Sequence, residues 1–321
     1  LQEKAAAILG LPPREIQALT ILRRAIDARE EVRLVYTLRV KVKNEEKVLR
    51  RCRSRQVSRA EKEHYRLPPP VQPPDIPPVV VGAGPGGLFC ALALARCGAR
   101  PILLERGKPV EERAEDVERF WTTGHLDFQS NVQFGEGGAG AFSDGKLNTG
   151  TRDPSHRFIL GELVAHGAPE SILCDAKPHV GTDYLHRVLA SLRRELVSLG
   201  CDIRFGHQVT NLVLEEGHLS ALEVQGPECR YILPAREAVL ALGNSARDTF
   251  EMLHAAGVPM EPKPLAVGVR IEHLQKDIDA VQYKAQAGHP GVSRRDDNNR
   301  RMTPHPACSK DPGHRDIEQD T

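Results

Sequence analysis

The sequence predicts an α/β fold with a parallel sheet, because a strand, a glycine-rich turn, a helix and a second strand follow one another. Residues 76–81 are an apolar run that ends in three valines and leads into the turn Gly82–Gly87. Residues 85–97 carry apolar side chains at helical spacing, and 101–105 form a second apolar run that ends in Glu105. This order is typical of a βαβ unit, whose strands are buried on both faces.

The glycine spacing predicts what this unit binds. Gly82, Gly84 and Gly87 fit G-x-G-x-x-G, in which the first glycine makes the turn, the second lets backbone approach a pyrophosphate, and the third lets the helix pack on the sheet. Pro85–Gly86 complete that turn. Glu105 stands where an acid accepts hydrogen bonds from ribose hydroxyls and repels a 2′-phosphate. We therefore expect the ADP half of a dinucleotide other than NADP; the alternative is a glycine-rich turn without a ligand.

The charge of the chain is concentrated at its N-terminus. Residues 1–70 contain 17 Lys and Arg against 9 Asp and Glu, whereas the remainder contains 27 against 34. We predict a small basic α/β module over residues 1–66, with a helix at 13–30 and a strand at 32–42. Its charge is explained either as a solvated strand face or as a surface for an anionic partner such as RNA. Few aromatic residues are present there to stack on bases.

The next segment is a linker, because seven of the twelve residues at 67–78 are prolines. The periodicity that follows predicts an alternation of helices and strands, with three of the strands forming an antiparallel meander. The predicted helices are 110–120, 155–166, 182–199 and 247–256, and the predicted strands are 177–180, 201–205, 209–214, 219–224, 230–233 and 237–242.

A second glycine-rich segment spans residues 134–146 and is flanked by Phe134 and Phe142. Glycines at this density allow backbone to lie close against a flat or anionic ligand. A mobile surface loop is the alternative. Ser143, Asp144 and Lys146 follow the glycines and are candidates for contact with the reacting group, although solubility of the loop explains them equally well.

Cysteine usage and hydropathy limit the class of protein. The seven cysteines are spread along the chain without a C-x-x-C pair, which favours reduced thiols over a disulfide framework. No H-E-x-x-H and no cluster of Cys and His is present in the sequence, so we expect no metal site. No apolar run reaches membrane-spanning length and no signal peptide is visible. We expect a cytoplasmic protein with no membrane partner, or a plastid protein if the source is a plant.

The order of these features resembles that of FAD-dependent oxidoreductases with a glutathione-reductase-like Rossmann fold. More specifically, it is similar to bacterial and plastid FAD-dependent dehydrogenases of poorly defined substrate. The resemblance covers roughly residues 10–290, and its specific pieces are 21–37, Gly135–Gly140, Phe142–Lys146, Ala241–Phe250 and Pro262–Glu272. It implies FAD as the cofactor, NAD(P)H as an electron donor and a small-molecule substrate. The absence of a C-x-x-C pair argues against a dithiol–flavin disulfide reductase.

The resemblance also implies which residues hold FAD, although it names no catalytic acid or base. The turn Gly82–Gly87 and Glu105 would hold the ADP part, Arg106 would lie near the adenosine, and the backbone of Val209 near the adenine. The residues expected to approach the flavin or the pyrophosphate are Gly138, Ala139, Gly140 and Ser143, and those expected to close over the cofactor are Gly243 and Asn244. The family usually has His in place of Asn244, and Arg247 has a weaker claim to the site.

Proteins of this kind continue well beyond position 290, so we expect this chain to be truncated at its C-terminus. The expected domains are the basic module at 1–66, the linker at 67–78, an FAD-binding Rossmann domain at 79–262, the start of an incomplete substrate domain at 263–292 and a disordered tail at 293–321. Two alternatives to an active oxidoreductase stay open at this point. One is a flavoprotein that acts on RNA through the basic module, and the other is a catalytically inactive FAD-binding or scaffold protein.

Overall fold

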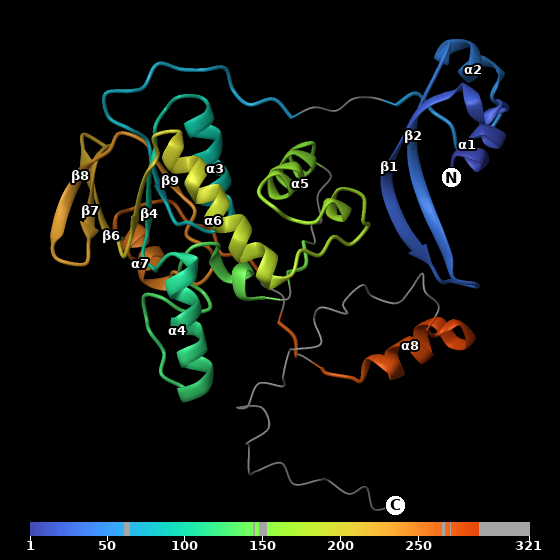
Figure 1. Ribbon diagram of the computed structural model, residues 1–321. Helices are drawn as coiled ribbons and strands as arrows, with labels where there is room; N and C mark the ends of the chain where they lie inside the picture. Colours follow the sequence, from blue (N-terminus) through green and yellow to red (C-terminus); the bar gives the residue numbers. More distant parts are fainter. Residues whose placement is uncertain (61–64, 144, 148–152, 265–266, 270, 289–321) are drawn as a thin grey trace, which may run out of the picture. The chain divides into compact units, whose positions relative to one another are not determined.

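The computed structural model of the chain describes residues 1–60, 65–143, 145–147, 153–264, 267–269 and 271–288 (Figure 1). They belong to two compact units. The first unit contains the described residues of Leu1–Arg66, Lys146–Val180 and Val267–Arg294. The second unit contains the described residues of Leu67–Gly145 and Gly181–Ala266. The tail expected at 293–321 lies outside the described residues, and the domain boundaries drawn from the sequence stay a prediction.

The second unit is built on a parallel sheet of four strands. These are β3 (Val79–Val81), β4 (Ile102–Glu105), β5 (Asp202–Phe205) and β9 (Ala238–Leu240), and their order across the sheet is β5-β4-β3-β9. The first strand of this set lies in the middle, with the second and third on one side and the fourth on the other. Strand order therefore reverses at β3, and a doubly wound sheet binds ligands at the carboxyl ends of the strands at such a point.

Alternate residues of the central strands face two different layers. Val80 and Leu103 pack with α3 (Pro85–Arg96) and α6 (Thr182–Ser198). Val79, Val81 and Leu104 pack instead with an antiparallel meander, β6 (Gln208–Glu215), β7 (His218–Gln225) and β8 (Arg230–Pro234) (Figure 1). Burying each such side chain stabilises the fold by about 1.5–3 kcal/mol. The predicted Rossmann fold with a meander is confirmed, and its continuous apolar runs reflect burial of the sheet on both faces.

Three further elements of this unit surround the end of the sheet where the strands finish. They are α4 (Val110–Thr123), the short 3-10 helix η2 (Gly138–Phe142) and α7 (Arg247–Ala255). The segment η2 is part of the second glycine-rich stretch, and α7 follows β9 directly in the chain. These elements place the second glycine-rich stretch and the residues after β9 near the first glycine turn.

The first unit contains a long two-stranded ribbon, β1 (Ile16–Asp27) and β2 (Arg33–Val42), with small helices against it. The predicted helix at 13–30 is therefore wrong. Two register shifts, between Ile16 and Ala18 and between Ile21 and Arg23, interrupt the pairing of β1 with β2. A bulge adds a residue to the strand, so apolar side chains no longer alternate strictly, and the resulting spacing imitates a helix.

The helices of the first unit are α1 (Gln2–Leu9), α2 (Glu45–Arg51), α5 (Ser155–Ala165) and α8 (Gln275–Tyr283), with the 3-10 turns η1 (Pro13–Glu15), η3 (Glu170–Leu173) and η4 (Lys284–Gln286). The residues after η3 pair with β1. Arg24 N donates to Cys174 O at 2.6 Å, Ala176 N donates to Arg24 O at 2.9 Å, and the Arg24 guanidinium donates to the Asp175 carboxylate at 2.8 Å. The basic ribbon is thus built into one unit with residues from the middle of the chain.

Candidate functional site

A cleft of about 340 Å³ opens where β3, β4 and β9 end, at the point where strand order reverses. Residues from both glycine-rich segments, from β6 and from the connection between β9 and α7 line it. The predicted cofactor-binding residues among them are Gly82, Gly84, Pro85, Gly86, Glu105, Arg106, Gly138, Ala139, Val209, Gly243 and Asn244. The structure therefore brings together residues that are far apart in the sequence, and it does so in the second unit alone.

The glycines of the first turn have different reasons to be glycine. Gly82 has φ +103°, and a Cβ there would lie 2.4 Å from the carbonyl oxygen of Ala241; a Cβ on Gly87 would lie 1.8 Å from the carbonyl oxygen of Gly82. Both are required by the fold. Gly84 has φ −71°, and the nearest heavy atom to its Cβ would be Gly138 Cα at 3.9 Å. A side chain at Gly84 fits the protein but would occupy the cleft, as expected where backbone must approach a pyrophosphate.

Glu105 joins three backbone segments around the cleft. One carboxylate oxygen, Oε2, accepts a hydrogen bond from Ala83 N at 2.7 Å, and Oε1 accepts from Gly107 N at 2.8 Å and from Gly135 N at 3.0 Å. The residue is 5% exposed. Since each oxygen has two lone pairs, Oε2 keeps one for a further donor. The carboxylate thus holds the two glycine-rich segments together and keeps one acceptor position on Oε2.

Arg106 is held at the mouth of the cleft by a network that the sequence did not indicate. Its guanidinium forms two hydrogen bonds to Asp248, at 3.1 and 2.9 Å, and lies 4.2 Å from the centre of the Phe134 ring. Its Nε donates to Gln129 Oε1 at 3.1 Å, and Gln208 Nε2 donates to Asp248 at 2.9 Å. Burial alone would raise the pKa of Asp248, but the hydrogen bond and charge of Arg106 outweigh it and lower that pKa.

Replacing Asp248 by Asn is expected to loosen Arg106 and weaken FAD binding by about twofold to fivefold, because a partly exposed ion pair contributes only about 0.5–1 kcal/mol. The pKa of Asp248 is lower in the folded chain than its ordinary value of 3.8. The pair therefore stabilises the fold above that value, and this contribution disappears as the pH falls through the lowered pKa. Thermal unfolding of D248N and wild type from pH 7 to pH 3 measures it: the two curves should converge at the acidic end, and a constant difference would contradict the assignment.

Several predicted residues do not line the cleft. Gly87 lies behind it and affects it through packing. Gly140 and Ser143 are outside its lining, and the Ser143 hydroxyl donates to Gly140 O at 2.9 Å. Lys146 belongs to the first unit, where it pairs through its backbone with His179. Asp144 lies outside the described residues.

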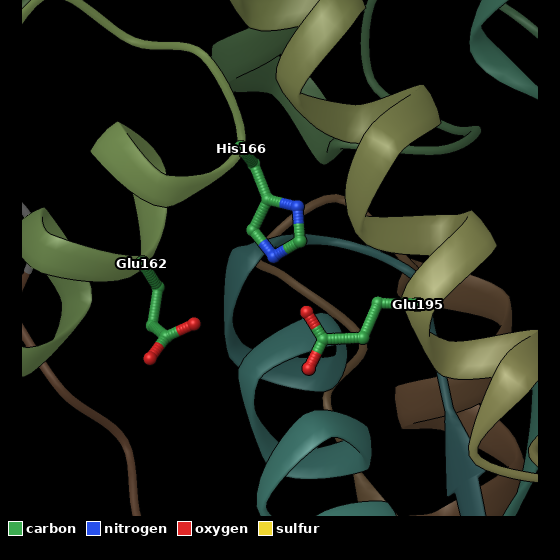
Figure 2. Close-up of side chains that lie close together, drawn as sticks. All are labelled: Glu162, His166 and Glu195. Carbon is green, nitrogen blue, oxygen red and sulfur yellow. The ribbon is translucent and has the colours of Figure 1, made fainter.

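One group of possible metal ligands occurs among the described residues: Glu162, His166 and Glu195 (Figure 2). Glu162 lies on α5 and His166 directly follows that helix, whereas Glu195 lies on α6 and forms an ion pair with Arg96 at 2.8 Å. The first two belong to the first unit and Glu195 belongs to the second. Neither unit alone supplies the group, so we assign no metal site to it, and the expectation of none stays an expectation.

Comparison with known families agrees with the geometry of the cleft. Residues 78–140, from β3 into η2, match a family model described as an FAD binding domain. Residues 1–43 match a domain of unknown function. Fold and cleft define the class as a dinucleotide-binding α/β protein of the Rossmann type. Residues 78–140 thus form an FAD-binding domain, and FAD is the cofactor of this domain.

The chain is also similar to two longer proteins. An uncharacterized protein of Clostridium beijerinckii is 40% identical over 299 residues, which are 92% of this chain and 55% of the relative. Protein FixC of Salmonella typhi is 28% identical over 225 residues, which are 67% of this chain and 47% of FixC. The chain thus spans about half the length of these relatives. Among solved structures, THI4 of Thermovibrio ammonificans aligns over 57% of this chain and 64% of its own, with 19% identity and a TM-score of 0.37.

No helix in the described part of the chain combines the length and apolar character that crossing a lipid bilayer requires.

Five residues that line the cleft were not identified from the sequence: Gln133, Phe134, His207, Gln208 and Thr249. Phe134 could have been found, because it is the first residue of the second glycine-rich segment. The others carry no motif, and only the tertiary fold places them beside the glycine turn.

Proposed function

We propose that this chain is the FAD-binding part of an FAD-dependent oxidoreductase that uses bound flavin for hydride transfer, with NAD(P)H as its electron donor. The observation that carries the proposal is Gly84. It lines the cleft, its backbone permits any residue, and a Cβ there would meet no protein atom closer than 3.9 Å. A glycine that the fold does not need, at the carboxyl end of the first strand, fits a backbone approached by a pyrophosphate.

The residues around the cleft have separate tasks in this proposal. The N-terminus of α3 would face the phosphates with the partial positive charge of its dipole. Glu105 would accept a hydrogen bond from one ribose hydroxyl, and Arg106 and Phe134, which line the cleft, would border the adenosine. Gly138, which lies against Gly84, and Ala139 complete the lining beside the first glycine turn. Bound FAD supplies the chemistry of accepting or donating a hydride, and the protein supplies binding and orientation.

The absorbance spectrum of the purified chain tests this function. We expect the two visible bands of an oxidised flavin, with a flavin fluorescence quenched relative to free FAD, and bleaching when NADH or NADPH is added under anaerobic conditions. A colourless protein that takes up no added FAD would contradict the proposal. A yellow protein that neither nucleotide bleaches would retain FAD as cofactor and reject NAD(P)H as the donor.

The two alternatives have their own outcomes. An inactive scaffold would bind FAD but resist reduction by any donor. For RNA binding by the basic module, part of the charge is already neutralised, since Arg24, Arg29 and Arg33 pair with acids of the same unit. That alternative stays a prediction; salt-dependent RNA binding that is lost on deletion of residues 1–66 would support it.

A further inference from the structure

A fully buried arginine lies directly behind the second glycine-rich segment. Arg113, on α4, is 0% exposed. Its Nε donates to Asn131 O at 2.8 Å, and its Nη1 donates to Glu136 O at 2.7 Å and to Gly138 O at 2.9 Å, with a longer contact to Gly135 O at 3.3 Å. One side chain therefore binds four carbonyl groups of the stretch that leads into the cleft.

This arrangement is costly for the fold. Moving a charge out of water is unfavourable unless it is paired, and an apolar side chain often serves a core as well or better. Arg113 forms no ion pair among the described residues, and its Nη2 is buried without a hydrogen-bond partner. Burial lowers its pKa to about 10, while the charges of Glu105 and Glu136 act in the opposite direction. The guanidinium is thus charged at neutral pH: its hydrogen bonds go to backbone carbonyls, its Cζ lies 4.7 Å from the centre of the Phe142 ring, and the charges of Glu105 and Glu136 stabilise it further.

The Arg113 side chain and the first glycine turn explain why glycines are needed in this segment. Gly135 has φ +118°, and a Cβ there would lie 2.4 Å from Arg113 Cδ. A Cβ on Gly138 would lie 3.2 Å from Gly84 Cα, and Gly137 N donates to Ala83 O at 2.8 Å. The segment is therefore fixed between Arg113 on one side and the first glycine turn on the other. Gly138, which Arg113 binds directly, lines the cleft.

We propose that Arg113 is a positioning residue for FAD: by binding the carbonyl groups of residues 131, 135, 136 and 138, it holds Gly138 and Ala139 in place in the lining of the cleft, beside the ADP-binding turn. The inference rests on the proposed function. Arg113 does not line the cleft, so it acts through the segment and not by touching the cofactor. Without it, the second segment keeps its hydrogen bonds to Glu105 and Ala83 but loses the four carbonyl contacts on its other side.

The test compares FAD with ADP, which lacks the flavin half. In R113K the positive charge remains, but the several planar N–H donors of the guanidinium are lost. We therefore expect FAD affinity to fall about tenfold or more, which corresponds to the free energy of one charge-assisted hydrogen bond. ADP affinity should change by less than about twofold, because Arg113 makes no hydrogen bond to the ADP-binding turn or to Glu105. R113M should show the same pattern more strongly. The matched control is R119M, on the exposed side of the same helix, where Arg119 pairs with Asp116 at 3.3 Å; it should bind both ligands as wild type does.

Titration of flavin fluorescence gives the FAD affinity, calorimetry gives that for ADP, and circular dichroism checks the fold of each variant. Unchanged FAD binding by a folded R113K overturns the inference. An equal loss of FAD and ADP also overturns it, because that pattern indicates general collapse of the cleft. If R113M does not fold, R113K decides alone. Failure of wild type to bind FAD would instead contradict the proposed function, so the two failures are distinguishable.

Discussion

Replacing Gly84 by leucine is expected to abolish FAD binding while the apoprotein folds as before. The backbone of Gly84 is extended, with φ −71° and ψ 179°, which every residue type adopts without strain. Its Cβ would lie 3.9 Å from the nearest protein atom, but the side chain would fill the cleft beside the glycine turn. We expect FAD affinity to fall about a hundredfold or more, which corresponds to roughly 3 kcal/mol.

The matched comparison is Gly87→Ala, on the same turn. There the added Cβ would lie 1.8 Å from the carbonyl oxygen of Gly82, so the helix must move away from the strand. Overpacking of this kind destabilises a core by about 1–3 kcal/mol or more. Thermal unfolding of the apoproteins should therefore separate the two variants: G84L at the wild-type temperature and G87A well below it. A G84L protein that keeps its flavin spectrum would contradict the assignment of the cleft to FAD.

Local patterns predicted the second unit well, because its elements are regular. Buried parallel strands are apolar runs, α3 and α6 carry one apolar stripe each, and the meander strands are separated by glycine turns. The ribbon of the first unit was mispredicted at β1, where bulges disturb the alternation of side chains. The pairing of β1 with residues 174–176 had no local signal, since it depends on two segments separated by 150 residues in the chain.

The site was predictable to the extent that it is made of backbone. The glycines at positions 82, 84 and 138 indicate places where the backbone lies close to a ligand or to other backbone, and all three line the cleft. Side chains that position this backbone were not predictable. Arg113 lies in a helix in which half of the residues are charged, so the sequence suggests a surface residue, yet it is completely buried. Asp248 lies in the first turn of α7, far along the chain from Arg106, and only folding joins them in an ion pair at 2.9 Å.

Replacing Glu105 by glutamine is expected to damage both the fold and FAD binding. The carboxylate accepts three backbone hydrogen bonds, two on Oε1 and one on Oε2. In glutamine one of these positions becomes an NH₂ group, so in either orientation at least one buried N–H faces another donor. Loss of the charge and of that hydrogen bond should cost about 2–5 kcal/mol. The ribose hydroxyl loses a charged acceptor at the same time, which should weaken FAD binding a further tenfold or so.

The control for Glu105 is Glu115→Gln, an exposed position on α4 where the same change of charge should alter the unfolding temperature by less than about 1 °C. Scanning calorimetry of the apoproteins measures the stability term, and FAD titration of the folded fraction measures the binding term. A normal unfolding temperature with weak FAD binding would make Glu105 a ribose ligand alone. A low unfolding temperature with normal FAD affinity would mean that Glu105 only holds the two glycine-rich segments together. Loss of both is the result expected from a carboxylate that holds two glycine-rich segments together and still has one lone pair open to the ligand.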